Sequence, residues 1–109
     1  MMAGMAGMYR MRDLLNLAAR EEAAELRLEA GRPPVMLLRG KSQMIDGVLL
    51  TSDEVAELFR SIATEEQRRE LDQCGDLCFI FVADNSARFS ITAVLQGQHL
   101  SLTAKNLGR

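Results

Sequence analysis

Alternating apolar residues in the last third of the chain constrain its fold more than any other feature. The stretches 76–83, 88–96 and 99–105 place an apolar residue at every second position. This two-residue period is that of β-strands that turn one face to a core. The residues of that face are Leu77, Phe79, Phe81, Phe89, Ile91, Ala93, Leu95, Leu100, Leu102 and Ala104. Asp84-Asn-Ser86 and Gly97-Gln98 separate the stretches and are typical turn sequences, so the pattern predicts three consecutive strands.

Two helix starts precede these strands. Thr51-Ser-Asp-Glu54 and Thr64-Glu-Glu-Gln67 both match the capping box, in which a hydroxyl accepts from an early helix amide and the residue three positions on reaches back. The first predicted helix has one apolar face, which consists of Val55, Leu58, Phe59 and Ile62. The second runs from about Glu65 to Gln73 and ends at Cys74-Gly75, since glycine commonly follows a helix.

In the N-terminal half, the spacing of apolar residues changes once, from helical to alternating. Residues 11–24 carry apolar side chains at helical spacing, which predicts a first helix. Residues 25–30 then alternate between charged and apolar, as a half-buried strand does. Gly31-Arg-Pro-Pro34 closes that strand, because proline has no N–H to give to a ladder.

The residues after the two prolines predict a hairpin. Val35–Arg39 and Gln43–Ile45 flank Gly40-Lys-Ser42, and Asp46-Gly47 marks another turn. The full order is therefore α-β-β-β-α-α-β-β-β with short connections. It predicts an α+β domain, an antiparallel sheet of about six strands with helices on one face.

Size and composition suit a single globular domain. The chain has 109 residues, of which 48% are hydrophobic and 26% charged. We expect a flexible leader at 1–10, one domain over 11–106 and a tail at 107–109. The apolar runs are too short to cross a bilayer, and a net charge of −2 with interspersed signs does not favour nucleic acid. Two thiols, Cys74 and Cys78, without redox or zinc spacing indicate a reducing cytoplasm.

No motif in the chain indicates catalysis, a cofactor or a metal. Gly40-Lys-Ser42 resembles the end of a phosphate-binding loop, but that loop needs a glycine where Val35 stands and a helix directly after it. We expect a hairpin turn there. His99 has no cluster of metal ligands around it and is expected to be a solvated strand-end residue.

Two predicted strands are apolar on both faces. Cys78, Ile80 and Val82 lie opposite the inward residues of their strand, and Met36 and Leu38 show the same doubling. A strand covered on one side only would alternate with polar residues. Two interpretations remain open. Either both strands are central and partly covered by the leader or a loop, or these five residues form a contact surface for a partner or a second copy.

Six segments of the chain, in order, resemble one family. They are Arg12-Asp-Leu-Leu-Asn-Leu-Ala-Ala, Glu25-Leu-Arg-Leu-Glu-Ala-Gly-Arg-Pro-Pro34, Gly47-Val-Leu-Leu-Thr51, Ile62-Ala-Thr-Glu-Glu-Gln67, Gly75-Asp-Leu-Cys-Phe79 and Arg88-Phe-Ser-Ile-Thr92. Together they resemble the PAS-like N-terminal domain of the type IV pilus retraction and type II secretion ATPases, the PilT/GspE-like family. The resemblance covers nearly the whole chain and stops where the motor domain of that family would begin.

The resemblance implies a domain without chemistry of its own, which packs against motor domains in a ring. In the family, arginines from the last strands approach the nucleotide at the interface. This chain keeps Arg88, but it has Ser90, Leu95 and Gly97 at three such positions and Lys105 at the closing one. Serine, leucine and glycine cannot replace a planar, bidentate phosphate clamp. Arg88 and Lys105 are therefore expected to be vestigial inter-domain contacts.

These expectations combine into a leading hypothesis with alternatives. The chain is expected to be a cytoplasmic, non-enzymatic interaction module, without cofactor or nucleic acid, that binds a pilus or secretion motor subunit or its docking protein, or associates with itself. One alternative is a PAS-like sensor with a small-ligand pocket of a few hundred Å³. Another is a truncated fragment of such a motor ATPase.

Overall fold

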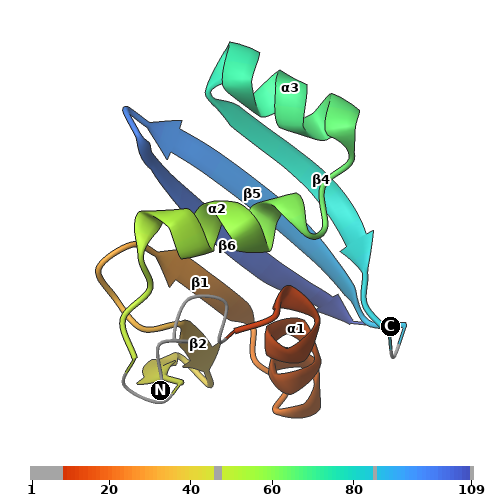
Figure 1. Ribbon diagram of the computed structural model, residues 1–109. Coiled ribbons are helices and arrows are strands. Elements are labelled where there is room, and N and C mark those ends of the chain that lie inside the picture. The colour runs from red at the N-terminus through yellow and green to blue at the C-terminus, as the bar shows by residue number, and fades with distance from the viewer. Residues whose placement is uncertain (1–8, 46–47, 85, 109) are drawn as a thin grey trace.

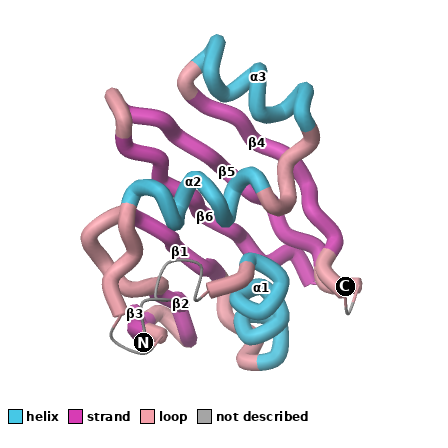
Figure 2. Tube along the Cα trace, viewed as in Figure 1, coloured by secondary structure: helices cyan, strands magenta, loops and turns pink. Residues whose placement is uncertain are grey.

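A computed structural model describes residues 9–45, 48–84 and 86–108. Over these residues the chain forms one antiparallel sheet of six strands, and three helices lie on one of its faces (Figures 1 and 2). The helices are α1 (Met11–Arg20), α2 (Ser52–Arg60) and α3 (Glu65–Cys74). The strands are β1 (Glu25–Glu29), β2 (Val35–Leu38), β3 (Lys41–Met44), β4 (Asp76–Val82), β5 (Arg88–Gln96) and β6 (His99–Gly108). The predicted α+β class and element order are confirmed.

The strand order β3-β2-β1-β6-β5-β4 places β6 between β1 and β5, so the first and last strand groups share one sheet. Leu26 pairs with Ala104 and Ala104 with Ile91, which puts the alternating apolar residues of three strands on the same face. The two ends of the sheet are β3 and β4. The predicted turn at Asp46-Gly47 and the middle of the turn at Asn85 lie outside the described residues.

Both predicted capping boxes are present. Thr51 Oγ1 accepts from the Glu54 amide at 3.1 Å, and the Thr51 amide donates to Glu54 Oε1 at 2.8 Å. The same reciprocal pair links Thr64 and Gln67. Gly75 follows α3 with φ of 85°, a left-handed conformation that glycine adopts without strain. Each cap contributes about 1 kcal/mol, which is enough to fix where a short helix begins.

The first helix is shorter than predicted, because α1 ends at Arg20 and not at residue 24. Glu22 has φ of 59°, its amide donates to the Ala19 carbonyl, and the Ala23 amide donates to the Ala18 carbonyl. These bonds form the Schellman motif, which usually has glycine where Glu22 stands. The absence of that glycine hid the helix end from sequence reasoning.

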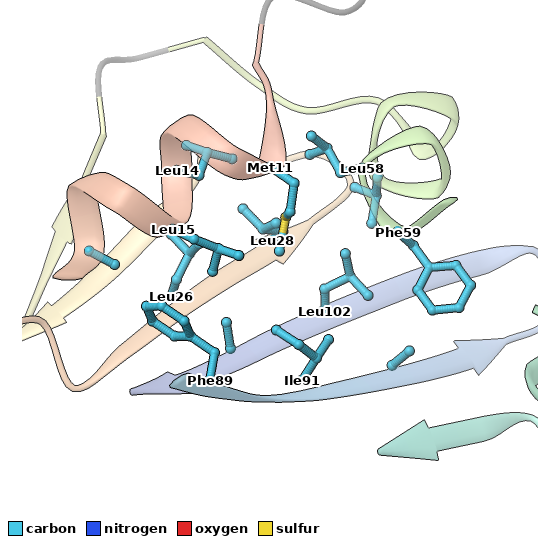
Figure 3. Close-up of a cluster of buried hydrophobic side chains, with 14 of the residues drawn as sticks. Met11, Leu14, Leu15, Leu26, Leu28, Leu58, Phe59, Phe89, Ile91 and Leu102 are labelled. Carbon is cyan, nitrogen blue, oxygen red and sulfur yellow. The ribbon is translucent and has the colours of Figure 1, made fainter. Parts of the chain in front are cut away.

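The core lies between the helices and the sheet (Figure 3). Met11, Leu14 and Leu15 of α1 pack over one half of the sheet. Over the other half, Phe59 of α2 meets Phe79 of β4 edge to face, with ring centroids 6.4 Å apart. Of the residues of α3, only Leu71 is fully buried. The α3 side of the sheet is therefore held by fewer apolar side chains than the α1 side.

The chain ends differ from the expected boundaries. Strand β6 continues to Gly108, which pairs with Arg88 after a register shift, so Leu107 and Gly108 belong to the sheet and not to a tail. Tyr9 lies within the predicted leader, and its hydroxyl donates to the Val48 carbonyl at 3.2 Å. Residues 1–8 lie outside the described part. No helix within the described residues is long and apolar enough to span a membrane.

Candidate interaction surface

Strand β4 exposes apolar side chains at the edge of the sheet. Cys78, Ile80 and Val82 lie on the face that carries no helix, and Ile80 and Val82 are 56% and 57% exposed. The register puts Ile80 beside Ser90 and Val82 beside Arg88 of β5. The interpretation that this strand is central in the sheet is wrong, because β4 is an edge strand. The interpretation as a contact surface remains a proposal.

The Cys78 thiol contacts two hydroxyls of β5. Its Sγ lies 3.5 Å from Ser90 Oγ and accepts from Thr92 Oγ1 at 3.7 Å. These hydrogen bonds, the one with Ser90 first, lower the pKa of Cys78 below the ordinary thiol value of 9.0, against a small opposing effect of burial. A thiolate nucleophile is therefore more populated at Cys78 than at an ordinary cysteine near neutral pH.

Two basic residues adjoin the apolar side chains of β4. Arg88 pairs with Val82, and Lys105 pairs with Ser90, the neighbour of Ile80, so all of them share the helix-free face. Both cations are exposed, and neither belongs to an ion pair among the described residues. We call Cys78, Ile80, Val82, Arg88 and Lys105 the β4 patch. It combines apolar anchors with two cations, of which Lys105 lies opposite Glu25 of β1.

Met36 and Leu38 do not join this patch, and their placement there was wrong. Met36 pairs with Leu26 of β1, lies on the helix-covered face and is only 4% exposed. Leu38 is half-buried and packs against the same core. The helix-free face of β2 carries Val35 and Leu37 instead. A run of four apolar residues has no alternation, so the sequence gives no signal of which face turns inward.

The positions that depart from the resembled family pattern do not lie together. Ser90 is on the helix-free face between Ile80 and Lys105. Leu95 is partly buried on the opposite, core face, and Gly97 lies in the tight turn between β5 and β6. No cluster of cationic side chains connects these positions, so the described residues offer no arginine clamp for a phosphate here.

The hairpin predicted around Gly40-Lys-Ser42 is present, but its turn is Arg39-Gly40, since Lys41 and Ser42 already belong to β3. Gly40 has φ of 79°, and Lys41 and Ser42 begin β3, which pairs with β2. The next helix is α2, which begins at Ser52, so no helix directly follows Ser42 as a phosphate-binding loop requires.

His99 has one contact that the sequence did not reveal. Its Nδ1 lies 3.2 Å from Ser52 Oγ at the start of α2. Both groups lie at the surface, and no carboxylate among the described residues hydrogen-bonds His99, so the pair lacks the oriented base of a nucleophilic site. Ser52 and His99 are 47 residues apart in the chain, so no local sequence pattern could predict this contact. Within the described ranges no His, Cys, Asp and Glu group could hold a metal ion.

A cleft of about 550 Å³ opens on the helix side of the molecule. It lies between the start of α1, helix α2 and the end of β4, and its apolar lining includes Met11, Leu58 and Phe81. Glu54, which is 9% exposed, and the ion pair of Arg12 with Asp84 at 3.0 Å give it a polar side. Its size fits a small molecule.

The chain is similar to ATPases of pilus and secretion machines. No protein-family profile matches the chain. Over 86 residues the chain is 29% identical to the type IV pilus retraction ATPase PilT of Pseudomonas aeruginosa. That alignment covers 79% of this chain and 25% of the relative, so the chain spans about a quarter of the length of that protein.

Solved structures agree with this relation. The crystal structure of the pilus retraction motor PilT with bound ADP superimposes with a TM-score of 0.81 at 21% identity, over 89% of this chain and 29% of the motor. The ATPase DotB of Legionella pneumophila gives 0.73 at 20% identity, over 88% and 28%. DotB of Yersinia pseudotuberculosis gives 0.67 at 13% identity, over 87% and 29%. These likenesses show a shared fold.

Proposed function

Because the chain is homologous to the N-terminal region of PilT-type ATPases and has the fold of that region, we propose that it is a non-catalytic interaction module. Its partner is a motor subunit of a type IV pilus or a related secretion machine, or the protein on which such a motor docks. The β4 patch is the observation that carries this proposal. It offers apolar anchors at the sheet edge, which are the kind of residue that interface cores use.

The charge of the patch defines the partner surface. Arg88 stands beside Val82 and belongs to no ion pair among the described residues, whereas Lys105 lies opposite Glu25 of β1. A complementary partner therefore presents an apolar pocket bordered by carboxylates. Ser90, which lies between Ile80 and Lys105, stands where the resembled family has an arginine, so we assign the patch to protein contact and not to nucleotide sensing.

A binding measurement with a purified PilT-type ATPase from the same organism tests the proposal. Val82→Asp puts a carboxylate among the apolar anchors, and we expect it to weaken binding at least ~10-fold, as the loss of an interface anchor does. Met44→Asp is the matched control, because Met44 is 63% exposed on the other edge strand. It should bind like the wild type.

Two results contradict the proposal. One is the absence of binding by the wild-type chain in the presence of ATP, of ADP and without nucleotide. The other is ATP hydrolysis by the purified chain alone, because an interaction module has no turnover.

A small-molecule sensor is a second candidate, and the 550 Å³ cleft is the observation that favours it. A ligand there would raise the melting temperature, because it binds only the folded state. Ser61→Trp would fill the cleft from its rim and abolish that rise. A metabolite panel that gives no rise with the wild type removes this candidate.

A further inference from the structure

We propose that two copies of this chain associate through the free edges of their β4 strands and form one continuous antiparallel sheet. This inference names a second copy as a partner of the module and rests on the proposed function only in that both use β4. The experiment below separates the two.

The backbone of β4 alternates between groups that bond to β5 and groups that face outward. The Leu95 amide donates to the Gly75 carbonyl, and the Ala83 amide donates to the Ala87 carbonyl. In an antiparallel ladder the hydrogen-bonded positions recur every second residue, so Leu77, Phe79 and Phe81 bond to β5. The outward N–H and C=O groups belong to Asp76, Cys78, Ile80 and Val82. They have no strand partner among the described residues.

The side chains of these outward residues do not protect the edge. Natural edge strands avoid pairing with other chains through shortness, lysine, proline, a bulge or a covering helix. Helix α3 runs beside β4 (Figure 1), but no backbone hydrogen bond to the outward groups of β4 is present among the described residues. Strand β4 has seven residues, reads Asp-Leu-Cys-Phe-Ile-Phe-Val, and pairs with β5 in a register without a bulge. Its one charge is Asp76, at its first position. Such an edge is a template for β-augmentation.

The strand is complementary to itself in one register. A two-fold axis at Phe79 places Cys78 opposite Ile80 of the second copy and Asp76 opposite Val82 of the second copy. All these pairs join outward-facing residues, so every outward N–H meets an outward C=O. The pairs on the helix side join Leu77 with Phe81, and Phe79 with its own copy. The side chains that meet are therefore apolar along the whole strand except at its ends.

The ends of this register bring opposite charges together. Val82 pairs with Arg88, so Asp76 of one copy lies two strands from Arg88 of the other on the helix-free face. Two strand spacings are about 10 Å, which an arginine and an aspartate side chain can span. Neither residue belongs to an ion pair among the described residues of the single chain. The symmetry supplies this pairing twice, which favours a second copy over an unrelated strand.

The opposite edge of the sheet does not offer the same template. Strand β3 has four residues, all exposed, and begins with Lys41. An assembly through β4 therefore buries the unprotected edge of each copy and leaves two protected ones. The product is a closed dimer and not a fibre.

Proline substitution at an outward position tests the pairing. Ile80→Pro removes one outward N–H without removing a bond to β5, and Ile80→Ala removes the same side chain but keeps the N–H. Ser42→Pro is the matched control on the other edge. The Ile45 amide donates to the Pro34 carbonyl, so Ser42 also faces outward from its ladder. Sedimentation over a wide concentration range measures the mass of each protein.

We expect the wild type, Ile80→Ala and Ser42→Pro to approach twice the monomer mass as concentration rises, and Ile80→Pro to remain monomeric. A wild type that stays monomeric into the millimolar range overturns the inference, and so does a dimer that survives in folded Ile80→Pro.

Disulfide trapping keeps the inference testable if Ile80→Pro does not fold. In a Cys74→Ser background, Ile80→Cys places the new thiol opposite Cys78 of the second copy, with Cα atoms about 5.5 Å apart, within disulfide range. We expect a covalent dimer under mild oxidation in this variant and much less with Cys78 alone, because the two Cys78 residues are diagonal neighbours. Equal or absent cross-linking in the two proteins overturns the inference.

Motor-ATPase binding by the wild-type chain, measured over the same concentration range as its mass, separates the two proposals. Binding without dimers in any protein sinks this inference and leaves the proposed function standing. Dimers without motor binding sink the proposed function and leave the β4 pairing.

Discussion

The two edges of the sheet are built in opposite ways. Strand β3 is short, and its Lys-Ser-Gln-Met sequence is exposed throughout. Strand β4 is longer, carries Phe79 and Phe81 on the helix-covered face, and presents Ile80 and Val82 to solvent on the other face. Exposed edge strands are usually short or charged, because unpaired backbone groups recruit other chains. The contrast supports our proposal that β4, and not β3, is the contact strand.

The largest expected effect comes from proline at adjacent positions of β4. Phe79→Pro removes a ladder bond to Ile91 and the edge-to-face contact with Phe59, so it should lower the free energy of unfolding by at least about 3 kcal/mol. Ile80→Pro removes only an outward N–H and should cost about 1 kcal/mol. Urea denaturation of both variants checks this. If both variants lose the same free energy of unfolding, Ile80 also bonds to β5. The N–H and C=O groups assigned to the outer edge of β4 would then not be free.

A middle-sized effect is expected from the helix that covers β4. Leu71→Ala removes the one buried side chain of α3 and should lower the free energy of unfolding by about 2–3 kcal/mol. This is near the low end for a buried leucine, because α3 can move toward the sheet and partly close the cavity. Hydrogen exchange should then rise first in α3 and β4 and last in β1. Asp72→Ala, at an exposed position of the same helix, is the control. An equal loss of protection across both halves of the sheet would contradict the conclusion that fewer apolar side chains hold the α3 side than the α1 side.

The smallest effect concerns the chemistry of the β4 edge. Hydrogen bonds from Ser90 and Thr92 lower the pKa of Cys78, so its thiolate appears at lower pH than that of an ordinary thiol. Ser90→Ala with Thr92→Val should shift the pH profile of Cys78 alkylation upward and slow the reaction at neutral pH. Mass spectrometry after iodoacetamide treatment measures this, and Cys74, which is also exposed, is the internal reference. An unchanged profile would mean that the hydroxyls do not stabilise the thiolate.

Local features of the fold were predictable, and non-local ones were not. The capping boxes at Thr51 and Thr64 depend on residues three positions apart, so the sequence located both helix starts. The end of α1 was missed because Glu22 adopts the left-handed conformation that normally signals glycine. Alternation fixed the inward faces of β4, β5 and β6. Of the candidate contact residues, Cys78, Ile80 and Val82 are exposed, whereas Met36 is buried.

The amino-acid sequence by itself determined the element types, their order and the inward faces of the alternating strands, because these depend on neighbours within a few residues. Only the tertiary structure decided that β4 is an edge strand and that Met36 faces the helices. Strand order and the orientation of an apolar run without alternation depend on which strands pair, and pairing is a contact between residues far apart in the chain.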